Sequence, residues 1–410
     1  MPNEIESTEA IDAAWMQRTL ALAARALGRT APNPAVGAVL VRDGVVVGEG
    51  WTAPPGGPHA EIVALRQAGD RARGATLYVT LEPCAHFGRT PPCVDALIDA
   101  GIARAVIALP DPFPGVSGRG IARLKQAGIA VSLGIEADAS IALNAGFLTR
   151  IGYGRPTVTA KYAMTLDGRI ATRAGHSRWI TGPEARRDAH RLRDTHDAIL
   201  VGIGTVLADD PLLTTRLPGE ACGDGGPHHP LRVVLDSQAR LPLDAAMLKP
   251  ETPGRTLIVT TERASNSAVE ALRATGADVV RLPECAGRID LQATLRLLAE
   301  RGVNSVLVEG GAMVLGALFD ADLIDQVVAF VAPVLVGGAA APGPIAGSGH
   351  ATMDAAARLR AVESRVVGTD VMLSGRLHAL PTLEDLWCLV ESSKRSGEFS
   401  HSTGAGATTR

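Results

Sequence analysis

The chain has 410 residues, of which 46% are hydrophobic and 20% are charged, and its formal net charge is −3. This length predicts two or three domains at about 150 residues each, and the composition is that of an ordinary soluble globular protein. The near-neutral charge argues against nucleic-acid partners, and the acidic segment 1–10 argues against a signal peptide. Five cysteines without a secreted-domain spacing indicate a reducing, cytoplasmic compartment.

The first 150 residues predict strands and helices in alternation after one hairpin. An amphipathic helix is expected at about 11–27, because Ile11, Trp15, Leu22 and Ala26 share one helical face. The hairpin joins strands 38–41 and 45–50 through Asp43-Gly44. Further elements are expected at 59–65 (helix), 75–81 (strand), 94–100 (helix), 105–109 (strand), 119–127 (helix) and 129–133 (strand). The order predicts a three-layer α/β domain with functional groups at strand ends and helix starts.

One imidazole and two thiols in this domain have the spacing of a zinc site. His59 lies two residues before Glu61, Cys84 follows a proline, and Cys93 lies nine positions after Cys84. Three such ligands leave a fourth zinc position for water, whose pKa falls to about 7 when bound. Glu61 is close enough to carry protons without binding the metal. H-x-E followed by Pro-Cys and a second cysteine is typical of zinc nucleobase deaminases.

The long step between the two cysteines predicts a loop. Gly88, Pro91 and Pro92 favour turns, and Cys93 is expected at a helix start, where the helix dipole favours a thiolate. Two alternatives remain open from the residues alone. The cysteines are ordinary core residues, or His86 closes a purely structural zinc site, which leaves Glu61 without a task.

The second half begins after a glycine-rich stretch at 144–156, where we place the domain junction. We expect domains at 1–150 and 151–379 and a disordered tail at 380–410. A strand is expected at 157–163, and a capping box of Thr181 and Glu184 predicts a helix to about residue 193.

Strands at 198–201 and 305–308 each run into a glycine-rich turn and a helix, an arrangement that suits phosphate binding but also tight structural turns. The apolar run 327–336 is either a buried strand or an exposed strand that pairs across a dimer. Pro333 and the glycines and prolines at 337–344 argue against a membrane span.

The motifs together resemble one family, the bifunctional deaminase/reductase of riboflavin biosynthesis, over about residues 11–375. The resemblance is carried by His59-Ala60-Glu61, by Pro83-Cys84-Ala85-His86-Phe87-Gly88-Arg89-Thr90-Pro91-Pro92-Cys93, by Leu166-Asp167-Gly168-Arg169 and by Leu207-Ala208-Asp209-Asp210-Pro211. It implies an α/β protein with an N-terminal cytidine-deaminase-like domain and a C-terminal dihydrofolate-reductase-like domain. Ala85 and Phe113 depart from the family, which has serine and asparagine there.

The resemblance also implies ligands and residue roles. It implies Zn²⁺, NADPH, a phosphorylated pyrimidine substrate and a homo-oligomer, expected to be a dimer through the reductase domain. Deaminase substrate contacts fall on Asn33 and His86, with Glu61 catalytic. Reductase proton transfer falls on Lys161 and Glu309. The NADPH contacts implied are Ala163, Trp179, Thr205, Asp209, Ser237, and the loop Gly311, Ala312, Met313, Val314, Leu315, Gly316 and Ala317. The sugar phosphate contacts implied are Lys161, Ser177, Arg193, Leu213, Arg216 and Glu309.

Two rival functions remain open at this point. A nucleoside or tRNA deaminase with an accessory domain predicts salt-sensitive RNA binding, which the charge balance does not favour. A non-catalytic sensor predicts ligand binding without turnover.

Overall fold

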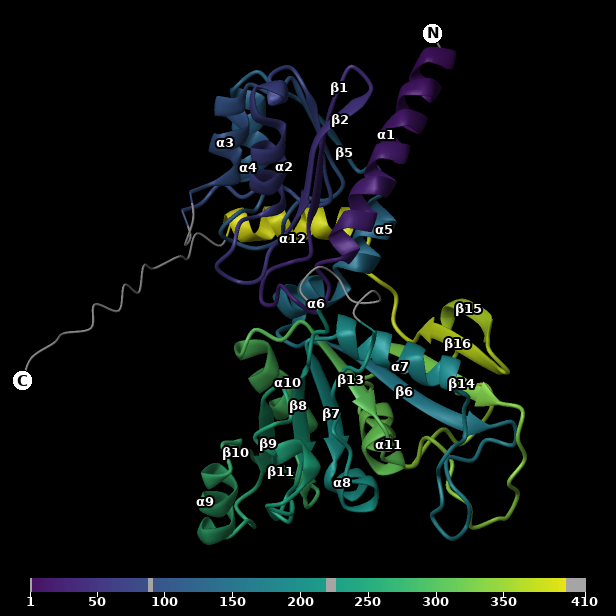
Figure 1. The fold of residues 1–410 in the computed structure, drawn as a ribbon. Helices are drawn as coiled ribbons and strands as arrows, with labels where there is room; N and C mark the ends of the chain where they lie inside the picture. The colour runs from purple at the N-terminus through teal and green to yellow at the C-terminus, as the bar shows by residue number, and fades with distance from the viewer. Residues whose placement is uncertain (1, 88–90, 219–225, 396–410) are drawn as a thin grey trace, which may run out of the picture.

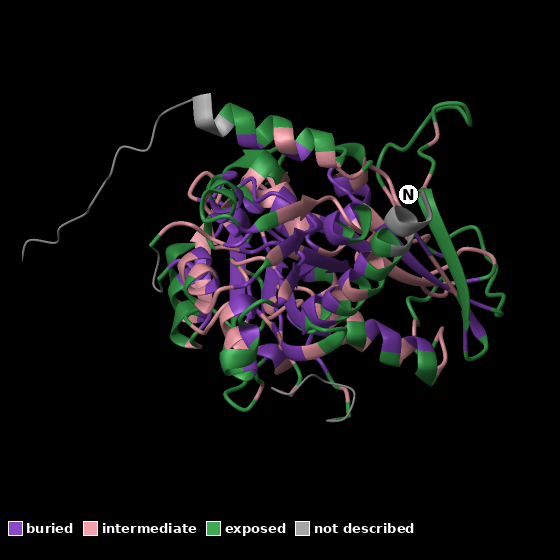
Figure 2. Ribbon diagram, turned by 90° about the horizontal axis from the view of Figure 1, so that it is seen from above, coloured by how far each residue is buried: buried purple, intermediate pink, exposed green. Residues whose placement is uncertain are grey.

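The computed structural model describes residues 2–87, 91–218 and 226–395. They form two α/β domains, each built on one large sheet, with the first domain above the second in Figure 1. Seen from above in Figure 2, buried residues concentrate in the strands and exposed residues on the outer helix faces. The α/β class predicted for both halves is confirmed. Gly88 and residues 396–410 lie outside the described residues.

The first domain has a five-stranded sheet in the order β2-β1-β3-β4-β5. Its strands are β1 (Gly37–Arg42), β2 (Val45–Trp51), β3 (Thr76–Val79), β4 (Arg104–Ile107) and β5 (Ala130–Leu133). Strand β1 pairs antiparallel with β2 and β3, whereas β3, β4 and β5 are parallel. The predicted hairpin and the strands that follow it are confirmed.

Helices cover both faces of this sheet and give three layers (Figure 1). Helices α2 (Ala60–Ala68), α3 (Cys93–Ala100) and α4 (Arg119–Gln126) lie on one face, and α1 (Pro2–Ala24) and α5 (Ala137–Leu143) lie on the other. The helix predicted at 11–27 therefore begins nine residues earlier and ends at Ala24. Asp12 on α1 fixes this helix to the sheet, because it accepts hydrogen bonds from Tyr78 and Arg104.

The chain passes between the domains as a helix. The glycine-rich stretch 144–156, where we placed the domain junction, contains the helix α6 (Ala145–Tyr153), which the composition did not predict. Buried Phe147 and Leu148 pack on the first core, and this burial outweighs the low helix propensity of glycine. Gly146 allows close approach, since a Cβ there would lie 2.7 Å from the Asn304 carbonyl oxygen.

The second domain has a nine-stranded sheet in the order β10-β9-β8-β7-β13-β6-β14-β16-β15. Its strands are β6 (Thr157–Thr165), β7 (Ala198–Gly202), β8 (Leu231–Leu235), β9 (Thr256–Thr260), β10 (Asp278–Arg281), β13 (Ser305–Glu309), β14 (Gln326–Ala332), β15 (Arg360–Val367) and β16 (Asp370–Arg376). Its helices are α7 (Pro183–Thr195), α8 (Ile203–Asp209), α9 (Asn266–Ala274), α10 (Leu291–Glu300) and α11 (Ala312–Asp320). A short ribbon pairs β11 (Glu284–Cys285) with β12 (Arg288–Ile289).

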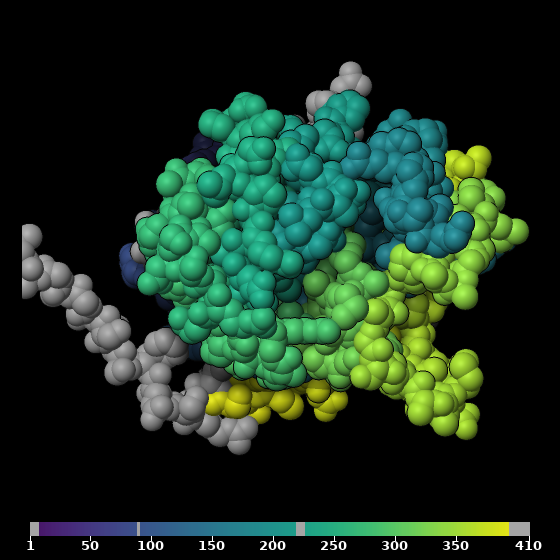
Figure 3. Space-filling view, turned by 90° about the horizontal axis from the view of Figure 1, so that it is seen from below, coloured from purple at the N-terminus to yellow at the C-terminus, as the bar shows by residue number. Residues whose placement is uncertain are grey.

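Strand β13 lies between β7 and β6, parallel to both, so the strand order reverses at this point. Open α/β sheets bind ligands at such a switch point, beyond the carboxyl ends of the strands. These ends point away from the first domain, toward the face shown in Figure 3. In that view a recess opens beside the blue-teal surface of the segment that follows β6.

Three sequence predictions for this half are decided by the structure. The predicted capping box of Thr181 and Glu184 is not formed, so that prediction was wrong. The N-cap of α7 is Gly182, whose backbone N–H donates to Asp370 on β16. The run 327–336 begins as the buried strand β14, which is internal between β6 and β16, so the exposed-strand alternative is wrong. The prediction of a disordered tail from residue 380 was wrong for residues 383–395, which form the helix α12 (Leu383–Arg395). Over the described ranges, no helix combines the length and the apolar character needed to cross a membrane.

Candidate active sites

Three predicted metal ligands converge where α2 and α3 begin. His59 is the N-cap of α2, Cys93 is the first residue of α3, and Cys84 follows β3. The Nδ1 atom of His59 lies 3.6 Å from the Sγ atom of Cys84 and 3.3 Å from that of Cys93. The three ligand atoms all lie within 4.8 Å of one another. The predicted position of Cys93 at a helix start is confirmed.

These distances fit zinc. Bonds of about 2.3 Å to sulfur and about 2.05 Å to nitrogen at tetrahedral angles separate the two ligand atoms by about 3.5 Å. A hydrogen bond with Cys93 lowers the pKa of Cys84 despite its burial, so the thiolate that a metal requires is favoured. The Cys93 backbone N–H also donates to the sulfur of Cys84 at 3.3 Å. The core-cysteine alternative therefore does not explain the arrangement.

His86 does not join the three ligands. Its ring packs against that of Phe113 instead, with the ring centroids 5.9 Å apart, and its buried Nδ1 atom has no hydrogen-bond partner among the residues that the structure describes. The closed structural zinc site that required His86 is therefore not formed by these residues.

Glu61 lies beside the ligands at the bottom of a cavity of about 480 Å³. Its side chain is buried, and burial followed by the charge of Cys84 raises its pKa to about 7. A carboxyl group poised near neutral pH can both accept and donate a proton. Asn33, His86 and Phe113 line the same cavity, so the structure brings the predicted deaminase substrate contacts together around Glu61.

Sequence reasoning missed Glu82, which organises one wall of the cavity. Its carboxylate accepts four backbone N–H groups, those of Asp111, Gly118, Gly120 and Ile121, at 2.8 to 3.1 Å. This fixes the loop from β4 to α4 that carries Phe113 and Val116 into the cavity. The position of Glu82 directly before Pro83-Cys84 was the available signal, but its partners lie about 30 residues or more away.

In the second domain, Lys161 and Glu309 meet across neighbouring strands. They are paired in the register of β6 and β13, and Lys161 Nζ lies 3.7 Å from Glu309 Oε2. Arg193 on α7 donates two hydrogen bonds to the same carboxylate, at 2.7 and 2.9 Å. Burial opposes ionisation of Glu309, but Arg193 and then Lys161 outweigh it and lower its pKa to about 2. Glu309 is therefore a fixed anion at neutral pH.

Two further predicted phosphate-site residues lie next to this cluster. Arg193 also donates to the Thr214 carbonyl, and Arg216 donates to the Thr214 hydroxyl. Leu213 is different, because its side chain is buried in a hydrophobic core. Only the Leu213 backbone, in a left-handed conformation with φ of 53°, belongs to the turn near the arginines.

The predicted NADPH residues gather at the carboxyl ends of the central strands. Thr205 follows β7, Ser237 follows β8 and Gly311 follows β13. Gly310 and Gly311 have φ of 73° and 77°, and a Cβ on Gly311 would lie 3.3 Å from Thr205 Oγ1. The two glycine-rich turns thus lie next to each other. Because glycine has no Cβ atom, a ligand can approach the backbone of these turns closely.

The other predicted NADPH residues lie outside these two turns. Residues 312–317 form the first turns of α11 rather than a loop, and Leu315 and Gly316 are buried against the protein. Trp179 is 71% exposed, and the guanidinium of Arg186 lies over its ring. Asp209 accepts a hydrogen bond on its carbonyl from Arg178, next to Ser177 and Trp179. Ala163 lies near the end of β6, two residues after Lys161.

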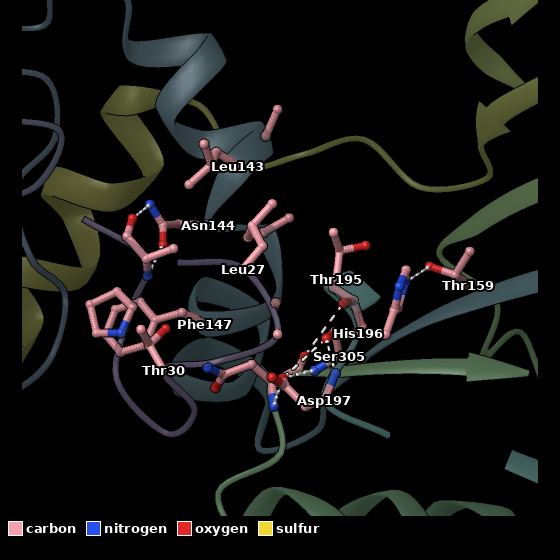
Figure 4. Close-up of a pocket in the computed structure, with 18 of the residues that line it drawn as sticks. Leu27, Thr30, Leu143, Asn144, Phe147, Thr159, Thr195, His196, Asp197 and Ser305 are labelled. Carbon is pink, nitrogen blue, oxygen red and sulfur yellow. Dashed lines mark hydrogen bonds between the residues drawn. The ribbon is translucent and has the colours of Figure 1, made fainter. Parts of the chain in front are cut away.

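A second cavity, of about 180 Å³, lies between the domains at the amino ends of the strands (Figure 4). There Asp197 accepts hydrogen bonds from the backbone and hydroxyl of Ser305, and His196 bonds Thr159. Asn33 and Phe147 line this cavity and the zinc cavity alike. It lies at the opposite end of β13 from Glu309, and neither Lys161 nor Glu309 lines it, so it is not the predicted reductase site.

Comparison with known proteins decides the family. Residues 9–109 match the cytidine and deoxycytidylate deaminase zinc-binding region, and residues 156–373 match the RibD C-terminal domain. The riboflavin biosynthesis protein RibD of Escherichia coli (strain K12) is 44% identical over 369 residues, which cover 88% of this chain and 98% of that protein.

The chain belongs to the RibD family.

Solved structures agree with this assignment. RibD from Acinetobacter baumannii is 38% identical with a TM-score of 0.80, covering 90% of this chain and 99% of that one. The deaminase/reductase from Thermotoga maritima is 35% identical with a TM-score of 0.77 and the same coverage. This chain is thus a bifunctional enzyme, with a zinc-binding deaminase domain followed by a reductase domain.

Proposed function

We propose that the chain catalyses two successive steps of riboflavin biosynthesis. The first is hydrolytic deamination of 2,5-diamino-6-ribosylamino-4(3H)-pyrimidinone 5′-phosphate. The second is NADPH-dependent reduction of the ribosyl group, which gives 5-amino-6-(5-phosphoribitylamino)uracil. The observation that carries the proposal is the meeting of His59, Cys84 and Cys93 beside the buried carboxyl group of Glu61, in a chain that also holds a reductase domain.

In the deaminase step, His59, Cys84 and Cys93 hold zinc. When bound, zinc lowers the pKa of water to about 7 and so supplies hydroxide at neutral pH. Glu61 takes the proton of the attacking water and delivers it to the departing amine, which leaves as ammonia. Asn33 and His86 hold the pyrimidine edge and its substituents within the cavity.

In the reductase step, bound NADPH would be the hydride source for the anomeric carbon of the opened ribose. Glu309 stays ionised, so Lys161 is the group with a proton to give to the sugar oxygen, and Glu309 holds it in place. Arg193 and Arg216 recognise the phosphate. The guanidinium suits a phosphate dianion because it donates two parallel hydrogen bonds.

The proposal also covers the cellular compartment and the oligomeric state of the enzyme. We infer a cytoplasmic enzyme, in keeping with its free cysteines. We also infer a homodimer through the reductase domain. Strand β15 supports this inference, because it is an edge of the nine-stranded sheet and exposes Val362 and Val366.

One assay tests both steps and both rivals. The full chain is incubated with the diaminopyrimidine substrate, and ammonia is measured first and NADPH absorbance second. We expect Glu61→Gln to lower the deamination rate by about 10²–10⁴-fold. The same variant should still oxidise NADPH when it is given the deaminated intermediate. Glu270→Gln, on an exposed helix face, is the control and should match the wild type.

Three results would contradict the proposal. A Glu61→Gln rate within a few-fold of wild type removes the assigned proton carrier. Ammonia from cytidine or from an adenosine-containing RNA, with none from the pyrimidine phosphate, supports a base deaminase instead. Tight ligand binding without turnover supports a sensor.

A further inference from the structure

The last helix of the described chain returns from the second domain to the first. Strand β16 completes the nine-stranded sheet, and α12 then packs beneath the first domain (Figure 1). The match to the RibD C-terminal domain ends at residue 373, before this helix begins. The helix is therefore an addition to the two matched regions and needs its own explanation.

The sequence of α12 explains why it docks. Leu383, Leu386, Trp387 and Val390 recur at helical spacing, so they form one apolar face. Leu386 and Val390 are fully buried, and Leu386 belongs to the first domain's core. The helix start is fixed by Thr382 and Asp385, which exchange hydrogen bonds between side chain and backbone.

One polar contact joins α12 to the deaminase cavity wall. The hydroxyl of Ser117 donates to the Val390 carbonyl oxygen at 3.2 Å, and both residues are buried. Ser117 has φ of 42°, in the left-handed region that a serine seldom adopts, so its backbone must be held by its surroundings. It ends the loop whose Phe113 and Val116 line the cavity.

The loop is thus held from two sides. Glu82 binds its backbone on the zinc side, and α12 binds Ser117 on the outer side. Within the loop, the Val116 N–H donates to the Phe113 carbonyl at 2.8 Å, so a shift at Ser117 is passed to Phe113. Phe113 in turn packs against the ring of His86.

We propose that α12 is a positioning element of the deaminase site, and that Ser117 is the residue through which it places Phe113 and Val116 against the substrate. The proposal rests on the deaminase function given above. The hydrogen bond from Ser117 joins α12 to the loop that carries Phe113 and Val116, so we expect its effect on substrate binding rather than on the metal or the chemical step. The reductase site lies at the far end of the second sheet and is independent of it.

The test uses full-length variants and measures KM and kcat of each step together with zinc content. Ser117→Ala removes the hydrogen bond and should raise the deaminase KM about threefold to tenfold. Leu386→Asp undocks the helix and should raise it by more than tenfold. Cys388→Asp places the same charge on the exposed face of α12 and should leave KM unchanged. Leu386→Met keeps the apolar volume and should restore near wild-type KM.

The outcomes separate this inference from the function on which it rests. If wild-type protein does not deaminate the substrate, the proposed function fails. If wild-type protein is active and the deaminase KM is unchanged in both Ser117→Ala and Leu386→Asp, the positioning role fails alone. It also fails if zinc content, kcat and reductase rates all fall as the deaminase KM rises, because that pattern marks a general loss of folding.

Discussion

Cys93 combines two properties at one residue: it is a metal ligand and the first residue of α3. The helix start places its sulfur 3.3 Å from the Nδ1 atom of His59. The sulfur of Cys84 accepts a hydrogen bond from the backbone N–H of Cys93, so the start of α3 positions both sulfurs. Removing the Cys93 sulfur therefore removes a ligand without disturbing the second domain.

We expect Cys93→Ser to lower the zinc content from about one per chain to well below half, because a serine hydroxyl is a poor zinc ligand. Deamination should fall at least 100-fold, in line with the loss of the nucleophile, while reduction of added intermediate should continue. Zinc is measured by atomic absorption on the purified chain. Cys388→Ser, which changes an exposed thiol, is the control. A Cys93→Ser protein with full zinc and full deamination would refute the ligand assignment.

At the residue scale, the two sites differ in how far the sequence could predict them. Metal ligands require particular side chains, so His59, Cys84 and Cys93 could be assigned from residue type and local spacing. Lys161 and Glu309 are far apart in sequence and meet only because β6 and β13 pair in register. Nothing local to either residue indicates that pairing, and only the family resemblance pointed to them.

At the scale of elements, the loop from β4 to α4 depends on one carboxylate. Glu82 is buried, and its two oxygens share four backbone N–H donors. Burial raises its pKa, and the four donors act in the opposite direction by favouring the charged form. A neutral side chain of the same shape cannot accept all four, because one of its ends is itself a donor.

We expect Glu82→Gln to lower the free energy of unfolding by about 1–3 kcal/mol, the cost of leaving buried donors unpaired. The deaminase KM should also rise, because Phe113 and Val116 belong to the same loop. Urea unfolding of the full chain measures the first effect and steady-state kinetics the second. Glu270→Gln removes an exposed ion pair and should change stability by less than about 0.5 kcal/mol. Equal stability of the two variants would count against this role of Glu82.

The elements that sequence reasoning placed wrongly share one cause. Helix α6, the start of α7 and helix α12 are all set by contacts with the other domain or with distant strands. Gly146 suited a break by composition, but it allows α6 to approach Asn304. The N-cap of α7 is decided by Asp370, a residue far along the chain. Periodic strands buried on both faces were predicted well, because their pattern is local.

At the scale of the whole molecule, the domains are joined firmly while their sites face apart. Arg29 donates to both carboxylate oxygens of Asp194 across the interface, and Arg150 donates to Asn304. The amino ends of β6 and β13 line the interdomain cavity, whereas Glu309 is the last residue of β13 and Lys161 lies beside it, midway along β6. Four residue steps along β13 alone add roughly 13 Å between the cavity and Glu309.

This geometry predicts that the deaminated intermediate travels through solvent. Phe147 and Arg150 of the connecting helix α6 line the zinc cavity. The recess beside the segment that follows β6 lies on the face that points away from the first domain (Figure 3). A chain that lacks one activity should therefore be complemented by a chain that lacks the other. We expect Glu61→Gln mixed with Lys161→Met to convert substrate fully and to oxidise NADPH after a lag that shortens as either variant is increased.

The complementation experiment is designed to exclude mixed oligomers. Each variant is attached to a separate batch of beads, so that only small molecules pass between the two, and NADPH absorbance is followed in the shared solution. Each batch alone should leave NADPH unchanged over the same period. Restored turnover between the batches requires a free intermediate, because the working deaminase site and the working reductase site are then on separate beads. A contradicting result would be that the two batches together stay inactive while beads that carry the wild-type chain oxidise NADPH without a lag. The intermediate would then pass from site to site within one molecule, and the prediction of travel through solvent would be wrong.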